Sequence, residues 1–398
     1  MPTLETITLH KFRGLQNLEL NDLGKVNLLV GNNNSGKTSI LEALSIYANP
    51  LNIGEWWSTA YKRKDTSRSS SFIEILRWIF YQDLNIDSDG EFAVGTVGGE
   101  FSISAEGENL HVSKLWAEHS VIEELHQPNR KDYHSWDENI PELESIRGIE
   151  LQILLSLKGL SSTTYTRSDF NDDPSVIYRK INSETCHEQI RLRFWDTSSL
   201  RFSPIRDYKI LTQLVSPISH RLERSQLQLL SEAQYKHFKS DVIQLLQQID
   251  DNIIDLHILA DPNGMTPRFN LVVEHQRLGF TPLNTFGDGL QRLFHIALKL
   301  PRAKDGFLLI DELESAIHTE ALQSSYRWLV KWCAEMNTQI FATTHSLEAV
   351  DALLSVTEAN DQLVLYRLEP GEEKTHVVRH GWERLKVLRE ELGQEVRW

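Results

Sequence analysis

The 398-residue chain has few cysteines and no long apolar run. Its two cysteines, Cys186 and Cys333, leave no disulfide framework and no CxxC metal or redox pair. So little cysteine is typical of a reducing compartment, and we expect the protein in the cytoplasm. No stretch of about 18 apolar residues occurs, so no helix is expected to span a membrane. The first residues also lack the basic and then apolar order of a secretion signal.

Positive charge is also scarce, because 41 Lys and Arg residues stand against 56 Asp and Glu residues, for a net charge of −15. Proteins that coat nucleic acid are usually basic, so this balance disfavours nonspecific DNA binding by the whole surface. A local basic face remains open at AYKRKDTSR, which contains Lys62, Arg63, Lys64 and Arg68. The simpler interpretation of this segment is a solvated loop.

Histidine is plentiful, but the fifteen histidines follow no metal-ligating pattern. Four of them, His111, His119, His126 and His134, crowd a region that we interpret as loop. Their spacing fits neither an HExxH helix nor a zinc finger. The sequence therefore predicts no metal besides one that accompanies a nucleotide.

The remaining composition, 40% hydrophobic and 24% charged, is typical of a globular protein with one elaborated domain or two. Three short strands are expected in the first thirty residues. From about 217 to 258 the chain is rich in Leu, Gln, Glu and Lys and has no glycine, which predicts two helices. Further strands are expected within residues 91–107, 148–159, 174–182 and 187–196.

One segment matches the phosphate-loop pattern GxxxxGK[ST] in full, between a strand-like VNLLV and an amphipathic helix. In this pattern the backbone N–H groups curl around the phosphates, Lys37 reaches the β- and γ-phosphates, and the Thr38 hydroxyl ligates Mg²⁺. The segment therefore predicts a site for ATP and Mg²⁺. Its predicted nucleotide-binding residues are Gly31, Asn32, Asn33, Asn34, Ser35, Gly36, Lys37, Thr38 and Ser39.

A carboxylate pair follows an apolar run later in the chain, in GFLLIDELESAIH. The run from Phe307 to Ile310 is typical of a strand buried in the centre of a parallel sheet. Asp311 is predicted to hold the magnesium, and Glu312 is predicted to orient and deprotonate the attacking water. Glu312 and Lys37 are therefore predicted catalytic residues.

About thirty residues later, TQIFATTHSLEAVDALL repeats the pattern of a strand that ends in polar residues. His345 stands at the end of this strand. A histidine at that position can donate a hydrogen bond to the γ-phosphate and sense its loss. We therefore predict that His345 is a third catalytic residue.

A second glycine-rich helix start lies in LNTFGDGLQRLFHIALKL, where Gly287 and Gly289 flank Asp288. Such a helix N-terminus, with close backbone approach, suits an anion. One chain does not need two phosphate-binding helix ends for one nucleotide, whereas two chains packed head-to-tail do. Gly287, Asp288 and Gly289 are therefore predicted to contact the ATP of a second copy, in an ATP-dependent homodimer.

The order of phosphate loop, glycine-rich helix, Asp-Glu strand and terminal histidine resembles the ABC-type ATPases, and among them the RecF/SMC-like group. The opening LHKFRGLQNLEL resembles the F-R-G strand pair of that group, which adds Arg13 to the implied nucleotide contacts. GNNNSGKTSILEAL, FGDGLQRL, LLIDELESAIH and ATTHS are most similar to the OLD-family and AAA_15/AAA_21-type ATPases.

The resemblance implies an α/β fold of the P-loop NTPase class, shaped as an ABC-ATPase-like head of two lobes. A central, mostly parallel sheet and an antiparallel lobe are expected, together with an inserted helical arm. Residues 1–205 are the expected first lobe with a variable middle region, residues 206–260 the helical arm, and residues 261–398 the second lobe.

The chain departs from these families at three points. Where the signature reads LSGGQ, this chain has FGDGL, so the serine hydroxyl is absent, although Thr285 could substitute for it. The expected strand-to-helix passage near residues 202–211 contains no Q-loop glutamine. Full-length OLD proteins carry a C-terminal Toprim nuclease, and no nuclease site is expected in these 398 residues; Asp87 and Asp89 are interpreted as a turn.

The resemblance implies an ATP-hydrolysing switch that, as a dimer, controls a separate effector such as a Toprim-type nuclease in anti-phage defence. The alternative is a RecF-like DNA repair or recombination ATPase that binds DNA. A transporter ATPase subunit is disfavoured by the missing LSGGQ and by the F-R-G opening. No membrane partner is expected.

Overall fold

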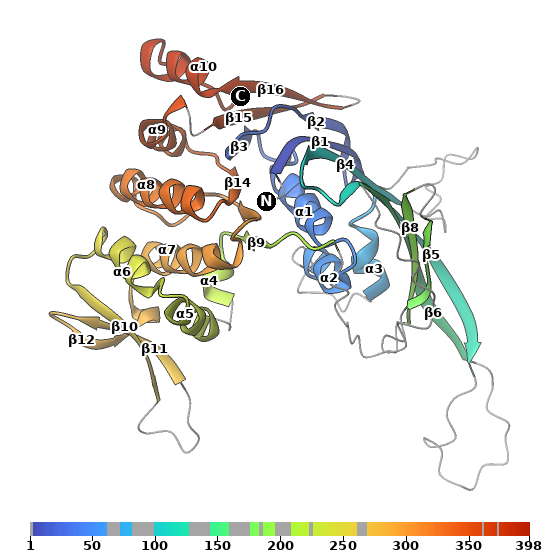
Figure 1. The fold of residues 1–398 in the computed structure, drawn as a ribbon, viewed down its shortest axis with the longest axis horizontal. Helices are drawn as coiled ribbons and strands as arrows, with labels where there is room; N and C mark the ends of the chain where they lie inside the picture. The colour runs from blue at the N-terminus through green and yellow to red at the C-terminus, as the bar shows by residue number, and fades with distance from the viewer. Residues whose placement is uncertain are drawn as a thin grey trace, which may run out of the picture.

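The computed structural model describes residues 3–61, 72–81, 99–126, 144–158, 176–182, 186–195, 208–222, 226–260, 269–359, 362–371 and 374–398. Two large sheets form the frame of the molecule, and helix α1 (Lys37–Ala48) lies between them (Figure 1). Eleven of the twelve residues of α1 are buried, because both sheets cover it. Within the described residues, no helix combines the length and the apolar character needed to cross a membrane.

The central sheet has six strands, and every neighbouring pair is parallel except the pair at one edge. All residues of β3, β13 and β14 are buried, which is the pattern expected for a parallel sheet covered on both faces. The expected parallel core is therefore confirmed. In sheet order the strands are β16 (Thr375–Gly381), β15 (Leu363–Pro370), β3 (Val26–Gly31), β14 (Gln339–Thr343), β13 (Phe307–Ile310) and β9 (Thr212–Val215).

The second sheet has seven antiparallel strands and extends away from α1 (Figure 1). In β8, buried and partly exposed side chains alternate, as expected when one face packs on a core. That face covers α1, α2 (Ile53–Tyr61) and α3 (Phe72–Arg77). In sheet order the strands are β2 (Leu15–Leu20), β1 (Thr3–Phe12), β4 (Glu100–Glu108), β5 (Val112–His126), β6 (Glu144–Leu157), β8 (His187–Trp195) and β7 (Val176–Asn182).

The interpretation of the histidine-rich region as loop is confirmed for His111, which lies in the bend between β4 and β5, and is wrong for His119 and His126. His119 and His126 belong to β5, which pairs with β6 along its whole length. The His119 side chain is buried, and this burial lowers its pKa to about 4. His119 is therefore a neutral core histidine whose ring lies tilted against that of Phe80, with the centroids 4.6 Å apart, whereas His134 lies outside the described residues.

Helices cover the other face of the central sheet and form a second core. Figure 1 shows α7, α8 and α9 side by side along this face. The helices here are α4 (Ser219–Leu222), α5 (Gln226–Tyr235), α6 (Lys239–Gln247), α7 (Asp288–Lys299), α8 (Thr319–Glu335), α9 (Leu347–Val356) and α10 (Trp382–Lys386). Short turns of other helix types are η2 (Leu283–Thr285), η3 (Leu300–Arg302) and η5 (Val387–Glu391).

The segment predicted as a helical arm, residues 206–260, contains α4, α5 and α6, but it also contains β9 and β10 (Ile253–Ala260), and it packs on the body of the molecule. Its first strand, β9, is the edge of the central sheet. Leu229, Leu230 and Leu245 are buried in the second core, and the Trp328 indole of α8 donates to the Asp241 carbonyl of α6 at 3.1 Å. Buried leucines on α5 and α6 therefore hold this segment against α7 and α8.

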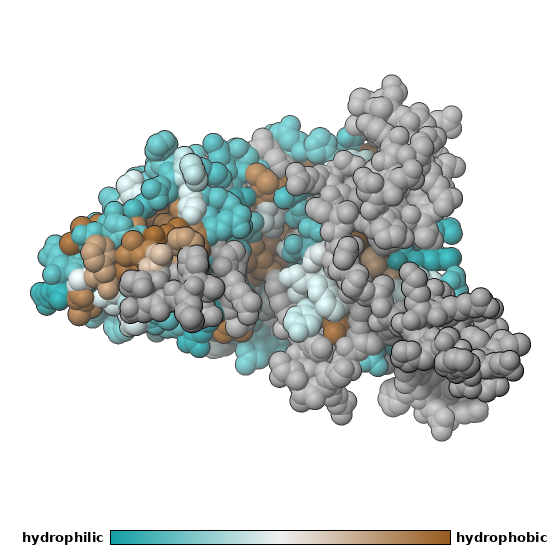
Figure 2. Space-filling model, turned by 90° about the horizontal axis from the view of Figure 1, so that it is seen from below, coloured by the Kyte–Doolittle hydropathy of each residue, from teal (hydrophilic) through white to brown (hydrophobic). Residues whose placement is uncertain are grey.

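A small sheet leads into α7. It consists of β10 (Ile253–Ala260), β11 (Phe269–His275) and β12 (Gly279–Pro282). Leu278 and Phe280 at its end are about three-fifths exposed. Figure 2 shows apolar residues gathered on this side of the molecule.

Candidate functional site

The predicted motifs meet at the carboxyl ends of the parallel strands of the central sheet. Leu309 of β13 pairs with Phe341 of β14, and Thr343 of β14 pairs with Leu29 of β3. The three strands are parallel, so the residues that follow them lie at the same end of the sheet. The phosphate loop, the Asp311-Glu312 pair and His345 are therefore neighbours.

The phosphate loop is bent by backbone conformations that favour glycine. Gly31 has φ of 143°, Asn34 of 62° and Gly36 of 95°. A Cβ on Gly31 would lie 2.5 Å from the Leu368 carbonyl oxygen, and one on Gly36 would lie 2.4 Å from Leu15 Cδ2. Side chains are therefore excluded from both positions, and the backbone turns into the N-terminus of α1 as a phosphate site requires.

Lys37 lies inside this loop, with only 6% of the residue exposed. Its ammonium donates to the carbonyl oxygens of Gly31 at 2.7 Å and Asn32 at 2.8 Å. Burial lowers the pKa of Lys37, while the nearby carboxylates of Asp311, Glu312 and Glu314 act to raise it. The loop thus holds a cation beside the N-terminus of α1, where phosphate oxygens would be bound.

A hydroxyl and a carboxylate meet beside the lysine. The Thr38 hydroxyl donates to the two carboxylate oxygens of Asp311 at 3.0 and 3.2 Å. The Thr343 hydroxyl also donates to Asp311, at 2.7 Å. Hydroxyl and carboxylate oxygens are ligands that Mg²⁺ prefers, so the donor set fits the predicted metal. Thr343 was not among the predicted site residues.

Glu312 has an unusual backbone conformation, with φ of 50°. Its N–H donates to the Thr343 hydroxyl at 2.8 Å, and its carbonyl accepts from Arg292 at 2.7 Å. These two bonds hold the backbone, while the residue as a whole is exposed. The carboxylate is therefore accessible to water at the edge where the phosphates would lie, as a general base must be.

Arg292 contacts the backbone of the candidate site, a contact that the sequence did not reveal. It lies on α7, it is fully buried, and it donates to the carbonyls of Ser216 at 3.0 Å, Asp311 at 2.9 Å and Glu312 at 2.7 Å. One side chain thus joins the glycine-rich helix α7 to the end of β9 and to the backbone of Asp311 and Glu312. Ser216 also begins the passage from β9 to α4, so this passage lies beyond the predicted residues 202–211.

Replacing Arg292 with methionine should lower the free energy of unfolding by about 3 kcal/mol, because buried carbonyl oxygens lose their donor. Urea unfolding measures the loss. Arg327→Met on the exposed side of α8 is the matched control and should unfold like the unmodified protein. Equal urea midpoints for the two variants would contradict a bridging role for Arg292.

Glu314 holds the chain next to the predicted histidine. Its carboxylate accepts from the Thr344 hydroxyl at 2.6 Å and from the His345 backbone N–H at 2.9 Å. His345 is partly buried between the end of β14 and the start of α9. The loop that follows Asp311 therefore fixes the position of His345.

The start of α7 bonds to α4. The Arg221 guanidinium donates to Asp288 at 2.9 and 2.6 Å, and the His220 ring contacts the same carboxylate at 2.8 Å. Arg221 and then His220 lower the pKa of Asp288 to about 2. Gly289 lies against the chain, since its Cβ would be 2.4 Å from the Ala316 carbonyl oxygen, whereas a Cβ on Gly287 would meet nothing within 4 Å.

Among the described residues, no hydrogen bond joins Gly287, Asp288 or Gly289 to the phosphate loop of the same chain. The Thr285 hydroxyl, considered as a substitute for the missing serine, donates to the Pro282 carbonyl at 2.7 Å. The predicted contact of this helix start with a nucleotide therefore stays a prediction.

Arg13 lies on the first lobe. Its guanidinium is 3.2 Å from the Glu42 carboxylate of α1 and also donates to the Thr59 carbonyl of α2. These contacts join β1 to the helices that it covers, and they give no support to the implied nucleotide contact. The basic segment 62–68 and the Asp87–Asp89 turn lie outside the described residues.

Known proteins resemble the chain over most of its length. The family model of the AAA ATPase domain, AAA_15, matches residues 3–350. An ATP/GTP phosphatase of Helicobacter pylori is 20% identical over 371 residues, which cover 90% of this chain and 89% of that protein. An uncharacterized protein of Methanocaldococcus jannaschii, MJECL11, is 34% identical over 113 residues, or 28% of this chain and 98% of that protein.

Solved structures with a similar course of the chain include heads of SMC proteins. The Smc head bound to the C-winged helix domain of ScpA has a TM-score of 0.46 at 11% identity, covering 96% of this chain and 99% of that chain. The SMC head domain from Thermotoga maritima has a TM-score of 0.38 at 14% identity, covering 95% of this chain and 98% of that chain.

Proposed function

Because the chain belongs to the AAA_15 family of AAA ATPase domains and is an ATP-hydrolysing enzyme, we propose that it is an ATP-dependent switch. In the ATP-bound state two copies form a homodimer. Each ATP lies between the phosphate loop of one copy and the start of α7 in the other. Hydrolysis of the bound ATP separates the two copies and so turns the switch off.

One observation carries this proposal: among the described residues, α1 and α7 both begin in a glycine-rich segment, and the Thr38 hydroxyl at the start of α1 bonds to Asp311, whereas no hydrogen bond joins the start of α7 to the phosphate loop. The start of α7 carries Gly287, beside which there is open space. The Asp288 carboxylate is already paired with Arg221, which offsets its repulsion of a phosphate. The positive end of α7 is thus available to the nucleotide of a second copy.

The residues of the site divide the work of hydrolysis. Lys37 and the loop N–H groups bind the phosphates, and Thr38 and Asp311 would hold Mg²⁺, which neutralises charge on phosphate oxygens. Glu312 orients a water molecule and accepts its proton. His345 donates to the γ-phosphate, and Arg292 keeps the α7 helix in register with Asp311 and Glu312.

Replacing Gly287 with tyrosine should leave ATP binding by the monomer intact but lower hydrolysis by about 100-fold, because the side chain occupies the space that the second copy's phosphates need. Steady-state hydrolysis and binding of a fluorescent ATP analogue measure the two effects. Gly287→Ala is the graded control, since its Cβ meets nothing within 4 Å of its own chain, and it should remain close to normal. Normal hydrolysis by the tyrosine variant would contradict the composite site.

A separate effector, such as a Toprim-type nuclease in anti-phage defence, is the proposed target of the switch. Its support is the similarity of the motifs to those of OLD-family ATPases. Co-purification with the product of the neighbouring gene, in the presence of ATP, tests this proposal, and absence of any co-purifying protein would contradict it.

The RecF-like alternative is distinguished by DNA. It requires that duplex or single-stranded DNA stimulate hydrolysis and that charge reversal at Lys62 and Arg63 remove the stimulation. ATP hydrolysis that is the same with and without DNA would leave the effector switch as the proposed role.

A further inference from the structure

We infer that Arg397 is a positioning residue for His345, so that the C-terminal tail, residues 392–398, controls the rate of ATP hydrolysis. The inference rests on the proposed role of His345 at the γ-phosphate. It adds a residue that lies near the end of the chain and is 52 positions away from the histidine.

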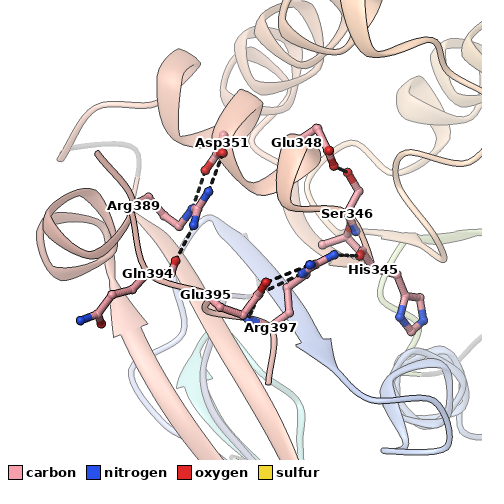
Figure 3. A network of polar contacts seen from close by, with 9 residues as sticks. His345, Ser346, Glu348, Asp351, Arg389, Gln394, Glu395 and Arg397 are labelled. Carbon is pink, nitrogen blue, oxygen red and sulfur yellow. Dashed lines mark hydrogen bonds and ion pairs between the residues drawn. The ribbon is translucent and has the colours of Figure 1, made fainter. Parts of the chain in front are cut away.

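Arg397 holds the backbone of His345, not its ring. Its Nη1 donates to the His345 carbonyl at 2.6 Å, and Figure 3 shows the imidazole pointing away from the guanidinium. On the other side, the His345 N–H donates to Glu314 at 2.9 Å. The peptide groups on both sides of this one residue are therefore fixed, one by the loop after β13 and one by the tail.

The guanidinium is itself held in place. Its Nε and Nη2 each donate to Glu395 at 2.9 Å, and the Glu395 side chain also accepts the backbone N–H of Arg397 at 2.9 Å. Arg397 lowers the pKa of Glu395 to about 2, so the pair is charged at neutral pH. The guanidinium also lies 4.1 Å from the Trp398 ring centroid. Two of its nitrogens are thus committed to the tail and the third to His345.

The tail is anchored at two points just before this contact. Val396 is 1% exposed and belongs to the second core. Arg389 of η5 donates to the Asp351 carboxylate of α9 at 2.7 and 2.8 Å and also to the Gln394 carbonyl (Figure 3). Through Arg389, the tail is therefore bonded to α9, the helix that begins two residues after His345.

The position of His345 needs such support because it lies in a short junction. β14 ends at Thr343 and α9 begins at Leu347, with Ser346 capping the helix by accepting the Ala349 N–H at 3.0 Å. Misplacement of a catalytic group by about 1 Å costs up to about 100-fold in rate. Loss of the Arg397 bond frees the carbonyl side of the junction while Glu314 still holds the amide side, so a smaller loss is expected.

Arg397→Gln should lower kcat for ATP about tenfold and leave ATP affinity within about twofold, because the phosphate loop is untouched. Arg397→Lys, which can still donate to the His345 carbonyl, should recover most of the rate. Arg327→Gln on the exposed side of α8 is the matched control and should hydrolyse ATP normally. Glu395→Gln, which releases the guanidinium without removing it, should shift kcat in the same direction and serves if Arg397→Gln folds poorly.

A double-mutant cycle with His345→Ala separates positioning from general support of the fold. If Arg397 acts through His345, adding Arg397→Gln to His345→Ala should cause no further loss of kcat. Independent, multiplying effects would overturn the inference, as would normal kcat in Arg397→Gln and Glu395→Gln. Normal kcat in His345→Ala itself would overturn the proposed role of the histidine, whereas an impaired His345→Ala beside a normal Arg397→Gln would overturn only the inference.

Discussion

Replacing Lys37 with alanine is expected to abolish measurable ATP binding and, with it, hydrolysis. The ammonium is buried within the loop and bonded to the Gly31 and Asn32 carbonyls, so no other side chain of the loop can take its place. Truncating a buried, hydrogen-bonded charge that faces its partner costs about 2–5 kcal/mol, which is roughly 30- to several-thousand-fold in affinity. Titration calorimetry with ATP and Mg²⁺ measures the loss.

Lys304→Ala is the control for the loss of one positive charge, because Lys304 is exposed in the turn before β13. It should bind ATP as the unmodified protein does. A Lys37→Ala variant that is folded and retains normal ATP affinity would contradict the assignment of residues 31–38 as the phosphate loop.

Replacing Glu312 with glutamine is expected to slow hydrolysis by at least about 100-fold while ATP affinity stays within about twofold. Glutamine has the same shape but cannot accept the proton of the attacking water. The structural bonds of residue 312 involve its backbone N–H and carbonyl, with Thr343 and Arg292, so the substitution leaves them in place. Steady-state phosphate release measures the rate of hydrolysis, and equilibrium binding measures the affinity for ATP.

Glu320→Gln in the first turn of α8 is the matched control, since this exposed carboxylate lies outside the site. It should hydrolyse ATP normally. Hydrolysis at the normal rate by Glu312→Gln would mean that another group accepts the proton.

The site motifs could be predicted because each is local and each follows a strand of the same parallel sheet. The apolar run at Phe307–Ile310 predicted a buried strand, and Asp311 and Glu312 follow it directly. The burial of all residues in β3, β13 and β14 bears out the predicted parallel core. The strand order β3-β14-β13, which the structure supplies, then places Lys37, Asp311 and His345 at the same end of the sheet.

The supporting residues could not be predicted, because their roles depend on contacts between distant parts of the chain. Arg292 reaches carbonyls 76, 19 and 20 positions away, and no local pattern distinguishes it from a surface arginine of an amphipathic helix. Thr343 belongs to the ATTHS motif, but its bonds to Asp311 and Glu312 require β13 and β14 to be adjacent. Arg397 is recognisable only when the tail lies beside α9.

Strand β5 was missed for a different reason. Its second half contains Glu123 and Glu124, and from Ser120 to Glu124 no described side chain is buried, so the period of two is absent there. This half of β5 is a strand because it pairs with β6, and the sequence pattern of β5 alone does not predict that pairing. The helices within residues 226–247 were predicted. Their packing on α7 could not be predicted, because the apolar face of a helix does not show which other element it packs against.

The most direct test of the composite site is the molar mass of Glu312→Gln measured by light scattering with and without ATP. The chain has a mass of 45.9 kDa. Because this variant binds ATP and hydrolyses it slowly, its mass should double when saturating ATP and Mg²⁺ are added and should stay at the monomer value without nucleotide. A mass that is the same in both conditions would contradict an ATP-dependent dimer.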